Sequence, residues 1–402
     1  MSTKPLPEIR EIPLILGGKV DVKDIIGRDE YVSCLWRDLK HTSIVINEIR
    51  RFGKTTILRL MESNPPEGWL CVRTSVQDIR SKAALTELTL GVLLGHAGIK
   101  EKAKKQIRSF GQIMQGTRIK TGIVEFSLNP DFQNNAFSIF RSILKDVDKQ
   151  LCEQNQKLVI IWDEFPDALR SVRRQEGLEA AEDIMSLFRV LREDDRSSNI
   201  RWVLTGSIGF HHVLQGQKDY INDMIAMGAP PLSNEWTCWL AEGLLLGIGV
   251  KNTTVSAISK ISGGIPFVLE MLVKYIRDNK VAVPTTEIEA KRLLVEAACS
   301  PEYGTNWAPL LERVDKYYKK ESLPIVKHIL DILACDSMSA ENLSESTKNK
   351  LKGCIEEEEI ENILDLLIED HYIQFDSNKG EFSWLYEPLK TIWLARRRGL
   401  RI

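Results

Sequence analysis

Short apolar runs alternate with amphipathic stretches through the first half of the chain, a pattern that predicts a parallel sheet covered by helices. Residues 157–162 (KLVIIW) are apolar after the first position, as expected of a central strand buried on both faces. An insertion at 117–128 alternates around Thr121-Gly122 and predicts a β-hairpin. The predicted strands of the sheet are 43–47, 69–74, 157–162, 200–205 and 225–229.

The pattern becomes helical after Pro230-Pro231, with predicted helices at 233–246, 255–261 and 267–277. The last hundred residues then follow the order helix, helix, helix, hairpin, which predicts a winged helix-turn-helix. The segments concerned are 323–333, 340–351 and 356–369 for the helices, and 372–375 and 381–384 for the strands.

Composition narrows the class of protein. With 402 residues, 43% of them hydrophobic and 27% charged, the chain is neither disordered nor a disulfide-stapled miniprotein. Its net charge of −2 does not favour a protein whose main task is to neutralise phosphate backbones. The seven cysteines are scattered without a CxxC pair, and no apolar run approaches the roughly 20 residues of a membrane span. We therefore expect reduced thiols, a cytoplasmic protein and no membrane segment.

Gly53-Lys54-Thr55 follows a predicted strand and precedes a predicted helix, the context of a phosphate-binding loop. In such a loop, backbone N–H groups and the helix N-terminus surround the phosphates. Lys54 would reach the β and γ oxygens, and the Thr55 hydroxyl would join a magnesium shell. The tripeptide alone also fits an ordinary lysine near a helix start.

Two further strand ends support the phosphate-binding interpretation. The strand 158–162 ends in Asp163-Glu164, where Asp163 would hold magnesium through water and Glu164 would orient the attacking water. The alternative is that both carboxylates cap the following helix. The strand 201–205 ends in Gly206-Ser207, which would place the Ser207 hydroxyl beside the γ-phosphate; the alternative is a solvated turn.

Five segments in order carry a resemblance to a known family. They are Ile26-Gly27-Arg28-Asp29-Glu30, Arg50-Arg51-Phe52-Gly53-Lys54-Thr55-Thr56, Ile161-Trp162-Asp163-Glu164-Phe165-Pro166, Leu204-Thr205-Gly206-Ser207 and Gly263-Gly264-Ile265-Pro266. This series resembles the archaeal-type ATPases, from the signal-transduction (STAND) branch of the AAA+ ATPases. The double arginine before GKT and the DE-aromatic-Pro after the strand are its specific parts.

The resemblance implies an α/β P-loop fold with helices on both faces of a parallel sheet, and ATP and Mg²⁺ as cofactors. It implies an amino-terminal arm (1–17), an ATPase core (18–232), a helical lid (233–283) and a carboxy-terminal helical and winged-helix domain (284–402). Nucleotide contacts would come from Arg51, Phe52, Gly53, Lys54, Thr55 and Thr56, with Ile26, Gly27 and Arg28 against adenine. The resemblance further assigns magnesium to Thr55 and Asp163, catalysis to Lys54, to the general base Glu164 and to the sensor Ser207, and a packing position near the nucleotide to the lid proline Pro266.

One position departs from the P-loop pattern, which has glycine where this chain has Glu48. Glycine tolerates backbone angles that cost other residues about 1 kcal/mol, and a carboxylate would repel phosphates. Arg50 and Arg51 could offset that repulsion. No arginine finger is assigned: Arg189, Arg192 and Arg196 could reach a neighbouring subunit's nucleotide, or form a solvated face.

The predicted third helix of the winged helix is acidic, with no Lys or Arg between Lys352 and Lys379. Phosphates would be repelled by it, so a structural or protein-binding role is favoured over DNA binding. The tail 396–401 is the strongly basic cluster and would suit nucleic acid or an acidic partner, or simply be solvated.

These observations favour an ATP-dependent molecular switch that acts on a protein partner or a separately encoded effector, as in defence or conflict systems, with nucleotide-dependent self-assembly an option. One alternative is a DNA-binding AAA+ ATPase resembling origin-recognition or transposition-helper proteins. Another is a pseudo-ATPase scaffold, for which Glu48 is the one supporting feature.

Overall fold

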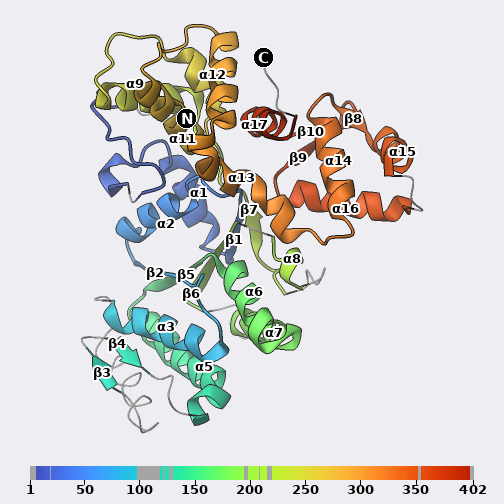
Figure 1. The fold of residues 1–402 in the computed structure, drawn as a ribbon. Helices are drawn as coiled ribbons and strands as arrows, with labels where there is room; N and C mark the ends of the chain where they lie inside the picture. The colour runs from blue at the N-terminus through green and yellow to red at the C-terminus, as the bar shows by residue number, and fades with distance from the viewer. Residues whose placement is uncertain are drawn as a thin grey trace. The chain divides into compact units, whose positions relative to one another are not determined.

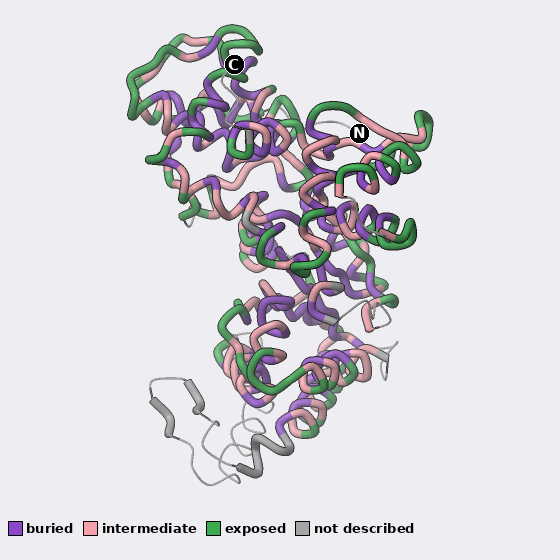
Figure 2. The backbone as a smooth tube through the Cα atoms, turned by 45° about the vertical axis from the view of Figure 1, so that its right-hand side comes forward, coloured by how far each residue is buried: buried purple, intermediate pink, exposed green. Residues whose placement is uncertain are grey.

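The structure is a computed structural model, and it describes residues 6–18, 20–96, 118–120, 123–125, 130–193, 198–207, 209–214, 220–351 and 355–398. The chain divides into two compact units, each formed by separate stretches of sequence. Unit 1 contains residues 1–29, 48–56 and 229–402, and unit 2 contains residues 30–47 and 57–228. Buried residues occur throughout both units (Figure 2).

Unit 2 is built on a parallel five-stranded sheet with strand order β2-β5-β6-β1-β7 (Figure 1). All five predicted strands are confirmed. Their bounds are β1 (Ile44–Asn47), β2 (Trp69–Ser75), β5 (Lys157–Asp163), β6 (Ile200–Gly206) and β7 (Ile225–Met227). The central strands β5 and β6 are buried along almost their whole length, as apolar strands covered by helices should be.

Helices and one small hairpin complete the fold around the sheet. The helices are α1 (Asp29–Asp38), α2 (Lys54–Ser63), α3 (Lys82–Gly95), α5 (Pro130–Glu153), α6 (Phe165–Glu176), α7 (Leu178–Glu193) and α8 (His211–Leu214). Strands β3 (Arg118–Lys120) and β4 (Ile123–Glu125) pair antiparallel, which confirms the predicted hairpin, although its turn residues lie outside the described part of the chain.

An aromatic cluster packs the interior of unit 2. Trp162 lies within 5.5 Å, between ring centroids, of Phe165, Phe188 and Trp202. Its indole N–H donates to the Thr89 hydroxyl at 3.0 Å, so the one polar group of this side chain is satisfied inside the core. The strand that carries Asp163 is thereby held in a fixed position.

Unit 1 is mainly helical. Its elements are η1 (Val22–Asp24), α9 (Asn234–Gly247), α10 (Ser256–Ser262), α11 (Pro266–Asn279), α12 (Glu287–Cys299), η2 (Pro301–Tyr303), α13 (Gly304–Tyr317), α14 (Leu323–Leu333), β8 (Met338–Ser339), α15 (Ala340–Leu351), α16 (Glu357–Glu369), β9 (Ile373–Asp376), β10 (Glu381–Trp384) and α17 (Glu387–Arg398). We call residues 304–398 the carboxy-terminal module. Its strands form an antiparallel sheet with order β8-β10-β9, beside which α14, α15 and α16 pack against one another (Figure 1).

One continuous hydrophobic core runs through unit 1. It includes residues of the amino-terminal segment, of the loop after β1 and of the carboxy-terminal module, among them Ile12, Ile49, Phe52 and Leu389. The amino-terminal segment is attached to α9 by a hydrogen bond from the Ile12 N–H to the Gly243 carbonyl at 2.9 Å. The loop that carries the GKT motif is therefore part of this core.

Candidate functional site

The loop Glu48–Gly53 begins directly after β1 and ends where α2 begins at Lys54. Arg51 and Gly53 have φ angles of 73° and 88°, in the left-handed region that glycine tolerates best. Glu48 is not among the residues with a positive φ angle. The backbone cost expected from the missing glycine at position 48 therefore does not arise.

Lys54 lies inside this loop and is 6% exposed. Its ammonium donates to the Glu48 carbonyl at 2.7 Å and to the Ile49 carbonyl at 3.1 Å. The loop is thus closed around the lysine, which holds a positive charge at the N-terminus of α2, where backbone N–H groups attract anions. In the same first turn of α2, Thr55 is exposed and Thr56 is half-buried.

The segment predicted to lie against adenine is attached to this loop. The buried guanidinium of Arg28 donates to the Phe52 carbonyl at 3.1 Å and also to the Pro230 carbonyl. Gly27 has a φ angle of 64°, and a Cβ atom there would lie 2.6 Å from the Trp236 ring. Ile26 packs against the core of unit 1. An adenine contact for these residues stays a prediction.

The lid helix α11 contacts the loop through Arg51. Pro266 is the first residue of this helix. Proline suits this position because an N–H group there would have no hydrogen-bond acceptor within the helix. The Arg51 guanidinium lies over the Phe267 ring, 4.9 Å from the centroid. Burial raises the pKa of Glu270 to about 7, although Arg51 and a backbone hydrogen bond from Gly17 act in the opposite direction.

A second group of predicted site residues lies at the carboxyl ends of β5 and β6 in unit 2. Asp163 is 3% exposed, and its Oδ1 accepts a hydrogen bond from the Thr205 hydroxyl at 2.6 Å. The Glu164 N–H donates to the same hydroxyl oxygen at 3.2 Å, and the Ser207 N–H donates to Glu164 Oε2 at 3.1 Å. Asp163, Glu164 and Ser207 are therefore brought together, with Thr205 between the two acids.

Glu164 has a strained backbone. Its φ angle of 61° is left-handed, and although it is the residue before α6, its side chain makes no capping hydrogen bond. The helix-cap alternative for Glu164 is therefore wrong. Ser207 is fully buried, so the solvated-turn alternative is wrong as well. Strain at a non-glycine residue persists where surrounding contacts impose it, and such residues cluster at active sites.

The register of the sheet shows where the loop that carries Lys54 leaves the sheet. Asn47, the last residue of β1, pairs with Gly206 of β6, and the loop begins at the next residue. Because the strands are parallel, the carboxyl ends of β1, β5 and β6 share one edge of the sheet. Ligands of open α/β sheets bind at such an edge.

The magnesium ligands expected from the resemblance are Thr55 in unit 1 and Asp163 in unit 2, and a shared magnesium ion stays a prediction. Asp163 and the Thr55 hydroxyl are hard oxygen ligands, which magnesium prefers alongside water and phosphate. No cluster of three or more His, Cys, Asp or Glu suited to a metal occurs in the described part of the chain.

Sequence reasoning missed four residues at these positions. Thr205 immediately precedes the Gly206-Ser207 pair, and its place near a predicted strand end was the sequence signal, whereas its contact with Asp163 depends on the sheet register. Arg73 lies 3.8 Å from Asp163 Oδ2, at the carboxyl end of the neighbouring strand β2. His371 and Tyr386 contact Glu48, with no local sequence signal for either.

One of the three arginine-finger candidates, Arg192, is engaged within unit 2. The guanidinium of Arg192 donates to both Asp223 carboxylate oxygens, at 2.6 and 3.0 Å, and lies over the Phe188 ring. With a side chain only 3% exposed, it is neither a solvated residue nor one that reaches outward. Arg196 lies outside the described residues.

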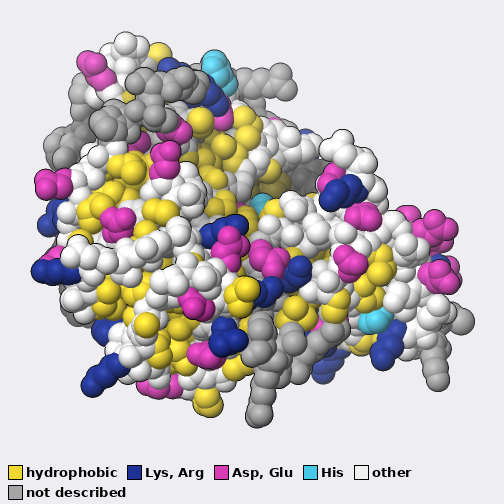
Figure 3. All heavy atoms as spheres, turned by 90° about the horizontal axis from the view of Figure 1, so that it is seen from above, with side chains coloured by type: hydrophobic (Ala, Val, Ile, Leu, Met, Phe, Trp, Pro, Cys, Tyr) yellow, Lys and Arg dark blue, Asp and Glu magenta, His cyan; other side chains and the backbone are white. Residues whose placement is uncertain are grey.

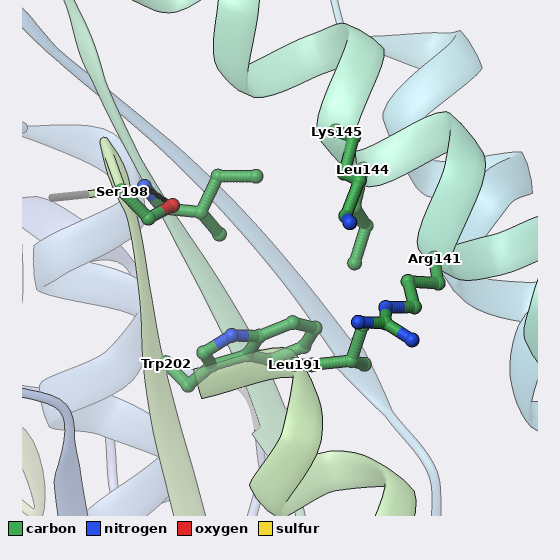
Figure 4. A pocket seen from close by; sticks show the side chains of 7 residues that line it. Arg141, Leu144, Lys145, Leu191, Ser198 and Trp202 are labelled. Carbon is green, nitrogen blue, oxygen red and sulfur yellow. Dashed lines mark hydrogen bonds between the residues drawn. The ribbon is translucent and has the colours of Figure 1, made fainter. Parts of the chain in front are cut away.

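A small pocket in unit 2 contains none of the predicted site residues. Its lining comes from α5, the end of α7 and the start of β6, including Arg141, Lys145, Ser198 and Trp202 (Figure 4). It lies at the amino end of β6, opposite to the end that carries Thr205. The predicted chemistry therefore does not use this pocket.

The acidic helix predicted in the carboxy-terminal module is α16. Its apolar positions Ile360, Ile363, Leu364 and Leu367 are buried, which confirms the predicted core face. Residues 356–359 and 361 are exposed glutamates. Asp370 differs, because it is 2% exposed and accepts a hydrogen bond from the Tyr318 hydroxyl at 2.9 Å.

Comparisons with known proteins establish the fold. No protein-family model matches the chain, and no curated protein does. A Walker-type ATPase of Pyrococcus abyssi shares 17% sequence identity, with 92% of this chain and 96% of that chain covered and a TM-score of 0.57. The ORC2 protein of Aeropyrum pernix, in ADPNP-ADP complexes, shares 15% identity over 93% and 96% of the two chains with a TM-score of 0.47. The likeness to the Pyrococcus abyssi protein, together with the parallel sheet, shows the α/β fold of P-loop ATPases. No helix in the described part of the chain is long and apolar enough to cross a membrane.

Proposed function

We propose that this protein binds ATP with Mg²⁺, hydrolyses it, and acts as a molecular switch of the archaeal-type STAND class. The hydrogen-bonded group Asp163–Thr205–Glu164–Ser207 is the observation that carries the proposal. It fixes two carboxylates at the edge of the sheet from which the phosphate-binding loop departs. A structural helix start needs neither the strained Glu164 nor the buried Ser207.

The roles follow from the groups each residue presents. Lys54 and the N-terminus of α2 would hold the phosphates, and Thr55 and Asp163 would hold Mg²⁺, which supplies charge neutralisation to the phosphoryl group when bound. Glu164 would orient and polarise the attacking water, since its backbone N–H is fixed by Thr205 and its carboxylate by the Ser207 N–H. Ser207 would present its hydroxyl toward the γ-phosphate.

A protein partner is favoured over nucleic acid for the carboxy-terminal module. Its elements occur in the order of a winged helix, and the helix that would enter a DNA groove is α16, which is acidic. Figure 3 shows acidic and basic side chains interspersed on one face of the molecule, without a broad basic region. We therefore propose that the nucleotide state is read by a protein, such as a separately encoded effector of a defence or conflict system.

The test is ATP binding and turnover by the purified protein beside three variants. Lys54→Ala should lose binding, because the ammonium inside the loop is removed. Glu164→Gln should bind ATP without turnover, because the amide keeps the hydrogen-bonding shape but cannot accept a proton. Glu179→Gln changes an exposed glutamate in the first turn of α7 and serves as the matched control, with turnover as in the wild type.

The possible outcomes of this test decide between the switch, the scaffold and the DNA-binding ATPase. Absence of ATP binding at millimolar concentration would reject the switch and favour the scaffold interpretation. Equal turnover in the Glu164→Gln variant and the wild type would reject Glu164 as the base. Stimulation of turnover by duplex DNA, lost at higher salt, would favour the DNA-binding alternative over a protein partner.

A further inference from the structure

Glu48, the residue that replaces a P-loop glycine, has a buried and fully engaged carboxylate. It is 1% exposed, and its Oε1 accepts a hydrogen bond from the Ile49 N–H at 2.9 Å. Its Oε2 accepts one from the Tyr386 hydroxyl at 3.2 Å and lies 3.6 Å from His371 Nδ1. A buried carboxylate is costly unless it is paired, so these partners account for its presence in the core.

Both partners belong to the carboxy-terminal module and are half-buried there. Tyr386 precedes α17, and its ring lies 4.7 Å from the fully buried Phe52 ring of the loop. His371 lies between α16 and β9 with a left-handed φ angle of 62°, a conformation that is uncommon for residues other than glycine. The residues on either side, Asp370 and Tyr372, are both buried. The module therefore presents both the imidazole and the phenol to Glu48.

The same residue connects this contact to the lysine. While the Glu48 side chain reaches the module, its carbonyl oxygen accepts the hydrogen bond from Lys54 at 2.7 Å. Loss of the side-chain contacts would release the backbone that closes the loop around Lys54. It would also leave Glu48 Oε2 without its hydrogen-bond donor, beside a loop that would have to accept phosphate charge.

We propose that Glu48 anchors the phosphate-binding loop to the carboxy-terminal module through Tyr386 and His371, which act as positioning residues for nucleotide binding. The module then regulates the affinity of the loop for nucleotide: docked, it preorganises the loop, and displaced, it weakens binding. This inference rests on the proposed ATP binding for its functional readout, but the anchor itself is a property of the protein without nucleotide.

A double-mutant cycle on the full chain tests the anchor. The dissociation constant of a fluorescent ADP analogue with Mg²⁺ is measured for the wild type, Tyr386→Phe, Glu48→Ala and the double variant. Tyr386→Phe should weaken binding about tenfold, because the buried carboxyl group of Glu48 loses a hydrogen-bond donor. In the Glu48→Ala background the same change should alter affinity less than about twofold, because the acceptor is already gone. His371→Gln should follow the same pattern.

Tyr303→Phe is the matched control. It removes a tyrosine hydroxyl that donates to a carboxylate, Asp278, at 2.9 Å in unit 1, away from the loop. Its nucleotide affinity should equal that of the wild type. An equal loss of affinity in Tyr303→Phe and Tyr386→Phe would mean a general loss of stability and would overturn the anchor.

A second readout separates the anchor from the proposed function. Urea unfolding of the same four proteins without nucleotide measures the Glu48–Tyr386 coupling directly. Coupling together with no nucleotide binding would support the anchor and reject the ATPase. Additive effects, or tighter nucleotide binding in Tyr386→Phe, would overturn the anchor while leaving ATP binding intact.

Discussion

Removing the Thr205 hydroxyl should lower the rate of ATP turnover as well as the free energy of unfolding. Thr205 is fully buried, and its hydroxyl donates to Asp163 Oδ1 at 2.6 Å and accepts the Glu164 N–H at 3.2 Å. Thr205→Val keeps the shape of the side chain but leaves one carboxylate oxygen and one N–H without this partner. Each buried group left unsatisfied costs about 1–3 kcal/mol, so for the two groups we expect a loss of roughly 2–6 kcal/mol in the free energy of unfolding.

The effect on catalysis follows from the position of both acids. With Glu164 in a left-handed conformation, its N–H contact to Thr205 helps to impose that conformation, and its loss would let the carboxylate move. A displacement on the scale of 1 Å costs on the order of a hundredfold in rate. We therefore expect kcat of Thr205→Val to fall about tenfold to a hundredfold with a smaller change in ATP affinity, and Thr205→Ser to restore it.

A matched control distinguishes this role from general stabilisation. The Thr89 hydroxyl is also buried in unit 2, donates to the Leu85 carbonyl at 2.8 Å and accepts from the Trp162 indole at 3.0 Å. Thr89→Val should lower the free energy of unfolding by an amount of similar order and leave kcat unchanged at temperatures where the protein is folded. Steady-state ATP hydrolysis and urea unfolding measure the two quantities. Equal kcat in the Thr205→Val and Thr89→Val variants would refute the reasoning.

Two further predictions concern the lid. A Cβ atom at Gly264, where φ is 73°, would lie 2.3 Å from the Leu232 carbonyl oxygen, so Gly264→Ala should lower the free energy of unfolding by at least about 2 kcal/mol. Gly249→Ala, at φ 84° with nothing near the new Cβ, should cost only about 1 kcal/mol; equal losses in urea unfolding would contradict the steric argument. Burial raises the pKa of Glu270 from 4.5 to about 7, so the folded state favours its protonated form. The stabilisation from Glu270 is therefore complete below pH 4.5 and is lost as the pH rises through about 7. Glu270→Gln should flatten the dependence of unfolding free energy on pH across this range, and an unchanged slope would reject the shifted pKa.

Local patterns predicted most of the sheet and the ends of its strands. The run 157–162 is apolar because β5 is covered on both faces, and Asp163 marks the point where that burial meets the site. In the same way, the Gly206-Ser207 pair predicted a polar position after β6. Thr205 was not predicted, because its hydroxyl role depends on the register that places β6 beside β5.

Contacts between distant segments account for the rest. Tyr386 lies 338 positions from Glu48, and neither the hydrophobic period nor any motif relates the two. From the sequence, Glu48 was expected to strain the backbone and to repel phosphates. Its φ angle shows no such backbone strain, and only the tertiary fold shows that the carboxylate has partners of its own.

The glutamate at position 48 is therefore weak support for a scaffold that has lost nucleotide chemistry. A loop released from function would be free to lose the Lys54 hydrogen bonds to the Glu48 and Ile49 carbonyls, yet both are present. A glycine at position 48 would allow the same backbone but offer no side chain to Tyr386. Under the proposed switch function, Glu48 thus provides a connection between the loop and the carboxy-terminal module, through which one part would sense the nucleotide state of another.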